Sequence, residues 1–180
     1  MTSFAKLSRV ISHALRHEPW LYELELDEAG WVSVSLLLGA LRAEVPAWAL
    51  LSEEDLRRMI TFSKKKRHEL LGGKIRALYG HSTQQKIMKE PAEPPSILYH
   101  GTAPTTAARI REDGLRPMGR QYVHLSADMV TAMKVGERKA TTPVVLSVRA
   151  GEAHRVGVRF YRGNALVWLA DEIAQGFIDP

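Results

Sequence analysis

In the first half of the chain, apolar positions recur with the period of α-helices in three segments, and a short extended stretch is expected at 24–34. Between residues 4 and 15, apolar side chains recur every three or four positions, which predicts a helix that buries one face. Pro19 disfavours helical geometry at the residue before it, so Arg16 and His17 are expected in the last turn. Both side chains should therefore lie at an edge, where the chain leaves the helix.

Turn and capping residues divide the rest of this half into short elements. A turn is expected at 27–30, followed by a helix that begins near residues 34–36. Ser52 and Asp55 have the spacing of a capping box and predict a third helix. Gly72-Gly73 separates two short segments and suits a tight hairpin, because glycine reaches positive φ without a steric penalty. Helices followed by a hairpin predict a winged-helix lobe over residues 1–82.

The second half carries the mixed pattern of strands and helices, after a break. Residues 83–95 contain three prolines and no periodicity, which indicates a linker. The expected strands are 97–99, 122–125, 144–148 and 165–169, and the expected helices are 105–112 and 127–138. The sequence therefore predicts an α+β protein with a mixed α/β lobe over residues 96–180.

Composition favours an anionic partner and gives no sign of a membrane segment. Lys and Arg total 25 against 20 Asp and Glu, for a net charge of +5 and a pI near 9.6. The sequence has no cysteine, which excludes disulfides and thiolate metal ligands. Charged residues interrupt the first apolar positions, and nowhere does an apolar run approach the roughly 20 residues of a membrane span. We expect a soluble, cytoplasmic protein without a membrane partner.

Four segments concentrate polar groups that packing explains poorly, although each has an ordinary structural explanation. Basic residues at a helix end commonly offset the macrodipole, which would account for Arg16 and His17. A run such as Lys64–Arg67 is commonly a solvated face or a nonspecific phosphate contact. The remaining two segments are Arg76–Ser82 and the pair formed by HGT at 100–102 and GRQYVHLS at 119–126.

Two histidines near the ends of predicted strands have unusual neighbours. A lone strand histidine is usually a packed residue, but Gly101 after His100 permits close backbone approach to a ligand. Thr102 and Ser126 each place a hydroxyl two residues after a histidine, the second of which is His124. If the two strands are neighbours, these groups would form a polar cleft.

Taken together, these segments resemble the tRNA 2'-phosphotransferase family. Eight segments carry the resemblance, in the family's order and spacing, and a chance match of all eight is improbable. They are LRHEP at 15–19, LDEAGWVSV at 26–34, KKRHEL at 65–70, GKIRALYGHS at 73–82, LYHGTA at 98–103, GLRPMGRQYVHLSAD at 114–128, PVVLSVRA at 143–150 and VWLADE at 167–172.

The resemblance implies a winged-helix RNA-binding lobe followed by an ADP-ribosyltransferase-like lobe that binds NAD. It also implies an enzyme that transfers an internal RNA 2'-phosphate to the ADP-ribose of NAD. The products would be nicotinamide, RNA with a 2'-hydroxyl and ADP-ribose 1'',2''-cyclic phosphate. The family's catalytic set matches Arg16, His17, Arg67 and Arg120. Arginine forks suit a phosphate dianion, and His17 suits proton transfer.

The resemblance also implies the binding residues. NAD would contact His100, Gly101, Thr102, Tyr122, His124 and Ser126. RNA would contact Arg76 and His81. No GxGxxG fingerprint occurs and the histidines show no metal-ligand spacing, so we expect neither a Rossmann site nor a metal.

Four positions depart from the family's pattern. Leu78 and Tyr79 replace an Asn and a Gln, although Tyr79 could stack on a base. His68 stands where the family often has an aromatic, and Glu18 stands where it favours Lys. Glu18 would weaken phosphate binding unless its side chain points away.

Two other functions stay open from the sequence. One is an ADP-ribosyltransferase that modifies a nucleic-acid end or a protein and leaves the ADP-ribose attached. The other is a nonenzymatic NAD-sensing nucleic-acid binder. The matched Arg-His-Arg-Arg set favours the phosphotransferase, and NAD consumption would separate either enzyme from a binder. The sequence does not identify the physiological RNA, and a monomer is the default expectation.

Overall fold

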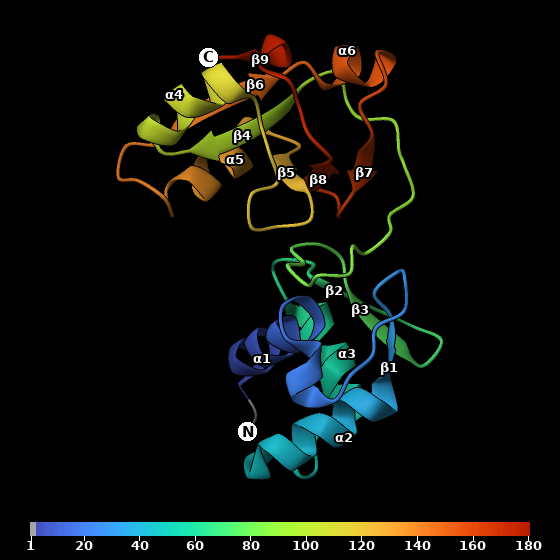
Figure 1. Cartoon of the computed structure of the whole chain (residues 1–180). Coiled ribbons are helices and arrows are strands. Elements are labelled where there is room, and N and C mark those ends of the chain that lie inside the picture. Colours follow the sequence, from blue (N-terminus) through green and yellow to red (C-terminus); the bar gives the residue numbers. More distant parts are fainter. Residues whose placement is uncertain (1–2) are drawn as a thin grey trace. The chain divides into compact units, whose positions relative to one another are not determined.

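The computed structural model describes residues 3–180 and divides the chain into two compact units, Met1–Met88 and Lys89–Pro180 (Figure 1). Each unit has its own hydrophobic core, and both combine helices with strands, which confirms the mixed α and β class. The segment expected as a linker is shared between them. The backbone N–H of Met88 donates to the Glu28 carbonyl, whereas Pro91 forms a bridge with Tyr161.

Unit 1 packs helices against a small antiparallel sheet. Its elements are α1 (Phe4–Arg16), η1 (Pro19–Tyr22), β1 (Val32–Ser33), α2 (Val34–Glu44), η2 (Pro46–Trp48), α3 (Glu53–Phe62), β2 (His68–Leu71) and β3 (Lys74–Ala77). The strands are ordered β1-β3-β2. Apolar side chains of α1, among them Leu7 and Ile11, are fully buried in the core, as the helical pattern predicts.

The local signals in the sequence are realised in unit 1. Ser52 and Asp55 form both hydrogen bonds of the capping box that begins α3. Gly72 and Gly73 have φ of 55° and 72°, and they form the two-residue turn of the β2–β3 hairpin. The three helices and the hairpin predicted for this half are confirmed.

Unit 2 is built on a larger antiparallel sheet, ordered β7-β8-β5-β4-β6-β9. Its elements are β4 (Leu98–Thr102), α4 (Pro104–Asp113), β5 (Val123–Ser126), α5 (Met129–Gly136), β6 (Val144–Val148), α6 (Ala150–Arg155), β7 (Phe160–Arg162), β8 (Val167–Ala170), η3 (Gln175–Phe177) and β9 (Ile178–Asp179). The four predicted strands and two predicted helices are present with small shifts. The sequence pattern missed α6, β7 and β9, which are short.

Helix α5 crosses β4 at Gly101. A Cβ at this position would lie 1.8 Å from the carbonyl oxygen of Ala132, so no other residue fits without moving the helix. The sequence pattern suggested that this glycine allows the close approach of a ligand. In the structure the backbone of α5 fills the space instead, because helix and strand pack in direct contact there.

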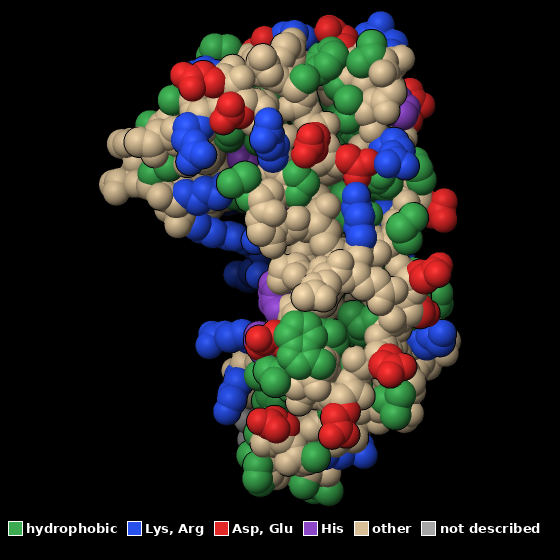
Figure 2. Space-filling view, viewed as in Figure 1, with side chains coloured by type: hydrophobic (Ala, Val, Ile, Leu, Met, Phe, Trp, Pro, Cys, Tyr) green, Lys and Arg blue, Asp and Glu red, His purple; other side chains and the backbone are tan. Residues whose placement is uncertain are grey.

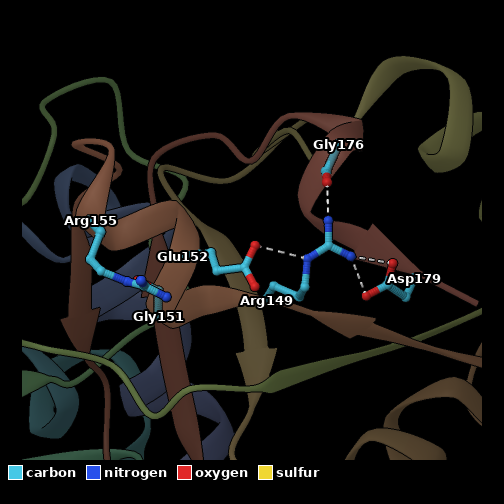
Figure 3. Close-up of polar contacts among 6 residues, drawn as sticks. All are labelled: Arg149, Gly151, Glu152, Arg155, Gly176 and Asp179. Atoms are coloured by element: carbon cyan, nitrogen blue, oxygen red, sulfur yellow. Dashed lines mark hydrogen bonds and ion pairs between the residues drawn. The ribbon is translucent and has the colours of Figure 1, made fainter.

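The end of the chain is fixed by Arg149, which follows β6 (Figure 3). Its Nη1 donates to both carboxylate oxygens of Asp179, at 2.5 and 2.6 Å. Its Nη2 donates to the Gly176 carbonyl and its Nε to Glu152, so one guanidinium ties η3 and β9 to the sheet. Among residues 3–180, no helix is both long and apolar enough to cross a bilayer.

Candidate active site

A pocket of about 530 Å³ in unit 1 lies between α1, the end of α3 and the segment that precedes β2. It is lined by Phe4, Ala5, Ser8, Arg9, Ser12, Arg16, Met59, Phe62, Ser63 and Arg67. Three of these described residues are arginines and none carries a carboxylate. In Figure 2, Lys and Arg side chains project from the left edge of unit 1, where Figure 1 places α1. The pocket therefore favours an anion.

Arg16 and Arg67, predicted from separate segments, line this same pocket. Nη2 of Arg16 donates to the backbone carbonyl of Arg67 at 3.4 Å. The guanidinium of Arg16 also lies 5.1 Å from the ring centre of Tyr79, within the range of a cation–π contact. Tyr79, considered from the sequence as a surface for a base, thus contacts a predicted catalytic arginine and orients it.

His17 is exposed at the C-terminal end of α1 and is held by Ser82. Its Nδ1 lies 2.8 Å from the Ser82 hydroxyl, and the Ser82 backbone N–H donates to the Arg16 carbonyl at 2.8 Å. These two bonds join the end of the helix to the loop after β3. The sequence pattern gave no role to Ser82, although this residue ends the GHS run of the matched segment.

His68 contacts Ser12, which lines the pocket, and adds no charge to the pocket. Its Nε2 lies 3.0 Å from the hydroxyl of Ser12. Burial, and secondarily the charges of Arg16 and Arg67, lowers the pKa of His68 to about 3. The ring is therefore neutral at physiological pH. Although His68 replaces the family's aromatic residue, the ring at this position is still uncharged.

The carboxylate of Glu18 is engaged by another side chain. It lies 2.9 Å from Nε2 of His13, whose Nδ1 lies 3.3 Å from the hydroxyl of Tyr22. The sequence left open whether Glu18 would oppose a phosphate beside His17. Its contact with His13 directs the carboxylate toward that ring.

The two residues predicted to contact RNA have partners inside unit 1. Nε and Nη2 of Arg76 donate to Glu69 at 2.8 and 2.7 Å, and the guanidinium lies 4.4 Å from the Trp31 ring centre. His81 is buried, close to Gly30. A phosphate would have to compete with Glu69 for Arg76, so RNA binding by these two residues stays a prediction.

In unit 2, the predicted NAD residues gather where β4 and β5 meet. The two strands are neighbours, as the polar-cleft hypothesis requires, but their register among the described residues records a single pair, Tyr99 with Ser126. Nδ1 of His100 lies 3.0 Å from the carbonyl oxygen of His124 and connects the strands beyond that pair. A carbonyl only accepts, so Nδ1 carries the proton.

The protonation of His100 follows from its surroundings. Burial lowers the pKa of His100 to about 4, and the charge of Lys139 acts in the same direction. The hydrogen bond to His124 opposes this lowering without overcoming it. With a neutral ring and the proton on Nδ1, Nε2 of His100 is a hydrogen-bond acceptor.

Arg120 lies against the second histidine of the junction. Nδ1 of His124 donates to the carbonyl of Tyr122 at 3.0 Å, and Nη1 of Arg120 lies 3.4 Å from Nε2 of His124. Because a guanidinium only donates, Nε2 of His124 accepts from it. The fourth predicted catalytic residue thus belongs to the same cluster as the predicted NAD residues.

Lys139 contacts the same cluster, and the sequence pattern did not reveal it. Its Nζ donates to the carbonyl of Gly101 at 3.3 Å. Burial, and then the charge of Arg120, lowers the pKa of Lys139. The signal available in the sequence was weak, since residue 139 falls between two matched segments.

Besides Gly101, three of the predicted NAD residues are buried, and the Thr102 hydroxyl has no hydrogen-bond partner among the described residues. Thr102 is 0% exposed, and Ser126 and Tyr122 are also buried. Burial raises the pKa of Tyr122 to about 12, and its ring packs edge-on against Tyr161. Their side chains reach a bound molecule only if the surrounding chain moves.

Comparison with known proteins decides what these two clusters belong to. A model of the family described as RNA 2'-phosphotransferase, Tpt1 / KptA family, matches residues 2–172. The chain belongs to this family. The resemblance seen in the eight segments is therefore confirmed, and so is the class of enzyme, a transferase.

Similar proteins from bacteria and archaea carry the same name, "Probable RNA 2'-phosphotransferase". The chain is 55% identical over 175 residues to that of Bacillus thuringiensis subsp. konkukian, covering 97% of this chain and 94% of the relative. It is 53% identical over 178 residues to that of Acetivibrio thermocellus, covering 99% and 97%. An Archaeoglobus fulgidus relative, numbered 1, is 36% identical over 173 residues, covering 96% and 79%.

Proposed function

We propose that this chain removes an internal 2'-phosphate from RNA in an NAD-dependent reaction that leaves a 2'-hydroxyl. The observation that carries the proposal is the pocket of unit 1, in which Arg16 and Arg67 lie together with no carboxylate among the described lining residues. The family supplies the substrate class. The geometry supports a binding site for the 2'-phosphate, which is the most highly charged group of that substrate.

The division of labour between the units is part of the proposal. Unit 1 would be a winged-helix lobe, supported by its three helices and the β2–β3 hairpin. Unit 2 would be an ADP-ribosyltransferase-like lobe, supported by the antiparallel sheet in which the HGT and HLS segments occupy the adjacent strands β4 and β5.

Binding of the 2'-phosphate would fall to Arg16 and Arg67. A phosphate is a compact dianion, and guanidinium groups bind its oxygens through paired, charge-assisted hydrogen bonds. The Tyr79 ring and the Arg67 carbonyl hold Arg16 in place before a ligand arrives, which lowers the cost of ordering that long side chain.

Proton transfer would fall to His17. An imidazole titrates near neutral pH and can both accept and donate a proton at the reacting oxygens. The Ser82 hydroxyl bound to Nδ1 fixes the orientation of the ring. Ser82 is thus a positioning residue, which acts through His17.

NAD binding would fall to unit 2, and three polar groups there support this part of the proposal. His100 offers a neutral acceptor at Nε2, which suits a ribose hydroxyl, and Arg120 and Lys139 offer positive charge for phosphate oxygens. When bound, NAD would supply an ADP-ribosyl group whose anomeric carbon is already activated by the cationic nicotinamide. Arg120 would then stabilise negative charge on the phosphoryl oxygens.

Product analysis tests the proposal. The full chain would be incubated with NAD and an RNA that carries one internal 2'-phosphate, with the same RNA lacking the phosphate as control. We expect loss of the phosphate together with nicotinamide and ADP-ribose 1'',2''-cyclic phosphate, only with the phosphorylated RNA. RNA that keeps an attached ADP-ribose would indicate the other transferase. Absence of nicotinamide release would indicate an NAD-sensing binder. A monomer and a cytoplasmic location stay predictions.

A further inference from the structure

The pocket of unit 1 extends well beyond the two arginines that the proposed reaction uses. Along α1, the lining residues Ala5, the pair Ser8 and Arg9, then Ser12 and Arg16 follow one another about one turn apart, so they share one face of the helix. From Ala5 to Arg16 this face is about 16 Å long, since a helix rises about 1.5 Å per residue. A single phosphate fills only a fraction of that length.

The part of the pocket farthest from Arg16 contains Arg9, a cation to which the proposed reaction gives no role. Arg9 is exposed, and in residues 3–180 its side chain forms no hydrogen bond or ion pair. It lies two helical turns, or about 10 Å, from Arg16 along α1, so it can meet a different phosphate from the one that Arg16 and Arg67 hold. Stacked nucleotides in one strand rise about 3.4 Å each, so a second phosphate of the same strand falls within this span.

Two phenylalanines, Phe4 and Phe62, line the same part of the pocket as Arg9. The rings of Phe4 and Phe62 are stacked, with centroids 6.3 Å apart and planes within 8°. Phe62 remains 69% exposed, although a solvent-facing phenylalanine contributes little to a core. An exposed ring beside a row of cations and hydroxyls is the combination that binds unpaired bases, through stacking and phosphate contacts together.

We propose that the α1 face of this pocket binds the single-stranded RNA that flanks the 2'-phosphorylated nucleotide. Arg9 binds a backbone phosphate and Phe62 stacks on a base. The proposal rests on the proposed function, because Arg16 and Arg67 are taken to hold the 2'-phosphate. It adds a second site that selects longer, unpaired RNA over a minimal phosphorylated dinucleotide.

The test compares two substrates in steady-state kinetics with full-length variants. One substrate is a dinucleotide with an internal 2'-phosphate, and the other has three further unpaired nucleotides on each side. We expect Arg9→Ala and Phe62→Ala to raise KM for the long RNA about tenfold. They should leave kcat, and KM for the dinucleotide, unchanged. Arg9→Lys should restore much of the loss, since the charge remains.

Lys6→Ala is the matched control, because Lys6 is a cation on α1 whose Nζ lies over the Trp48 ring and outside the pocket. The salt dependence of long-RNA binding should fall by about 0.7 in slope for Arg9→Ala and stay unchanged for the control. Circular dichroism would establish that each variant is folded.

The outcomes separate the two proposals. Equal effects of Arg9→Ala and Lys6→Ala on the long RNA, or equal effects of Arg9→Ala on both substrates, would overturn the flanking-strand site. Absence of turnover of either substrate by the wild type would instead overturn the proposed function. In that case, anisotropy with the labelled long RNA still decides the site, because it predicts weaker binding by Arg9→Ala than by Lys6→Ala.

Discussion

The two clusters of predicted site residues differ in how far they are open to solvent. In unit 1, Arg16 and Arg67 line an open pocket without a carboxylate among its described residues. In unit 2, His100 and Thr102 are partly or fully buried at a strand junction, and hydrogen bonds set the proton position of the histidine. The two half-buried arginines suit a small, doubly charged group. A junction of buried hydroxyls and a neutral histidine, with Arg120 and Lys139 beside it, suits a larger ligand that is recognised by shape and hydrogen bonds as well as charge.

The difference also shows where each cluster is vulnerable. The unit 1 pocket depends on charge, so a substitution there should alter function and leave the fold intact. The unit 2 junction depends on packing, because α5 leaves no room for a Cβ at Gly101 and His100 is bonded to the His124 carbonyl on the neighbouring strand. A substitution there should alter stability as well.

The largest expected effect is on catalysis, from removal of either pocket arginine. Arg16→Ala or Arg67→Ala should lower kcat/KM for 2'-phosphorylated RNA about 10²–10³-fold, because a charge-assisted contact to the phosphoryl oxygens is lost. The melting temperature of Arg67→Ala should stay near that of the wild type, whereas Arg16→Ala also loses its contacts with the Arg67 carbonyl and Tyr79 and should melt at a slightly lower temperature. Steady-state kinetics and thermal denaturation measure the two effects, with Lys6→Ala as the charge-matched control. An Arg16→Ala enzyme with normal kcat/KM would show that the charge of the unit 1 pocket does not serve the reaction.

The next effect is acid destabilisation through His100. Its pKa is about 4 in the folded chain, against about 6.5 when unfolded, so the unfolded state binds more protons between these values. The stabilising contribution is complete above about pH 6.5 and is lost as pH falls toward 4, at a cost of about 3 kcal/mol. Denaturant unfolding of wild type and His100→Gln across this window measures it. Parallel curves for the two proteins would contradict the assignment.

A smaller effect on stability is expected from Gly101→Ala. The added Cβ would overlap the Ala132 carbonyl, and such overpacking costs about 1–3 kcal/mol. The melting temperature of unit 2 should therefore fall by several degrees. Gly119→Ala is the matched control, because a Cβ added at Gly119 would meet nothing within 4 Å beyond its chain neighbours. Equal melting temperatures for the two variants would show that α5 does not constrain β4.

The smallest effect is expected at the orienting residue Ser82. Ser82→Ala removes one neutral hydrogen bond to His17, which is worth about 1 kcal/mol and corresponds to a several-fold lower kcat. KM should not change, and Ser82→Thr should restore the rate because it keeps the hydroxyl. A change in KM alone would indicate that Ser82 acts on substrate binding rather than through His17.

Local signals made most of the fold predictable. Pro19 placed the end of α1, Ser52 with Asp55 placed the start of α3, and Gly72-Gly73 placed the hairpin. These signals act between residues a few positions apart. Strand β9 was missed, because its place depends on the contact between Arg149 and Asp179, 30 residues apart.

The site was only partly predictable, for the same reason. Arg16 and Arg67 came from matched segments, whereas Ser82 and Lys139 take their roles from contacts across 65 and 38 residues. One missed contact was within reach. A two-residue turn at Gly72-Gly73 places Glu69 opposite Arg76 on the neighbouring strand. The ion pair that engages Arg76, a predicted RNA contact, could therefore have been predicted from the hairpin register.

The central claim is that the arginine pocket of unit 1 recognises the 2'-phosphate itself. Its most direct test is fluorescence anisotropy without NAD, with two labelled RNAs of one sequence that differ only in an internal 2'-phosphate. We predict that the wild type binds the phosphorylated RNA at least about tenfold more tightly, as expected for charge-assisted contacts. Arg16→Ala should lose most of this preference, with Arg67 alone left to hold the phosphate. Equal affinities in the wild type, or an undiminished preference in Arg16→Ala, would contradict the account.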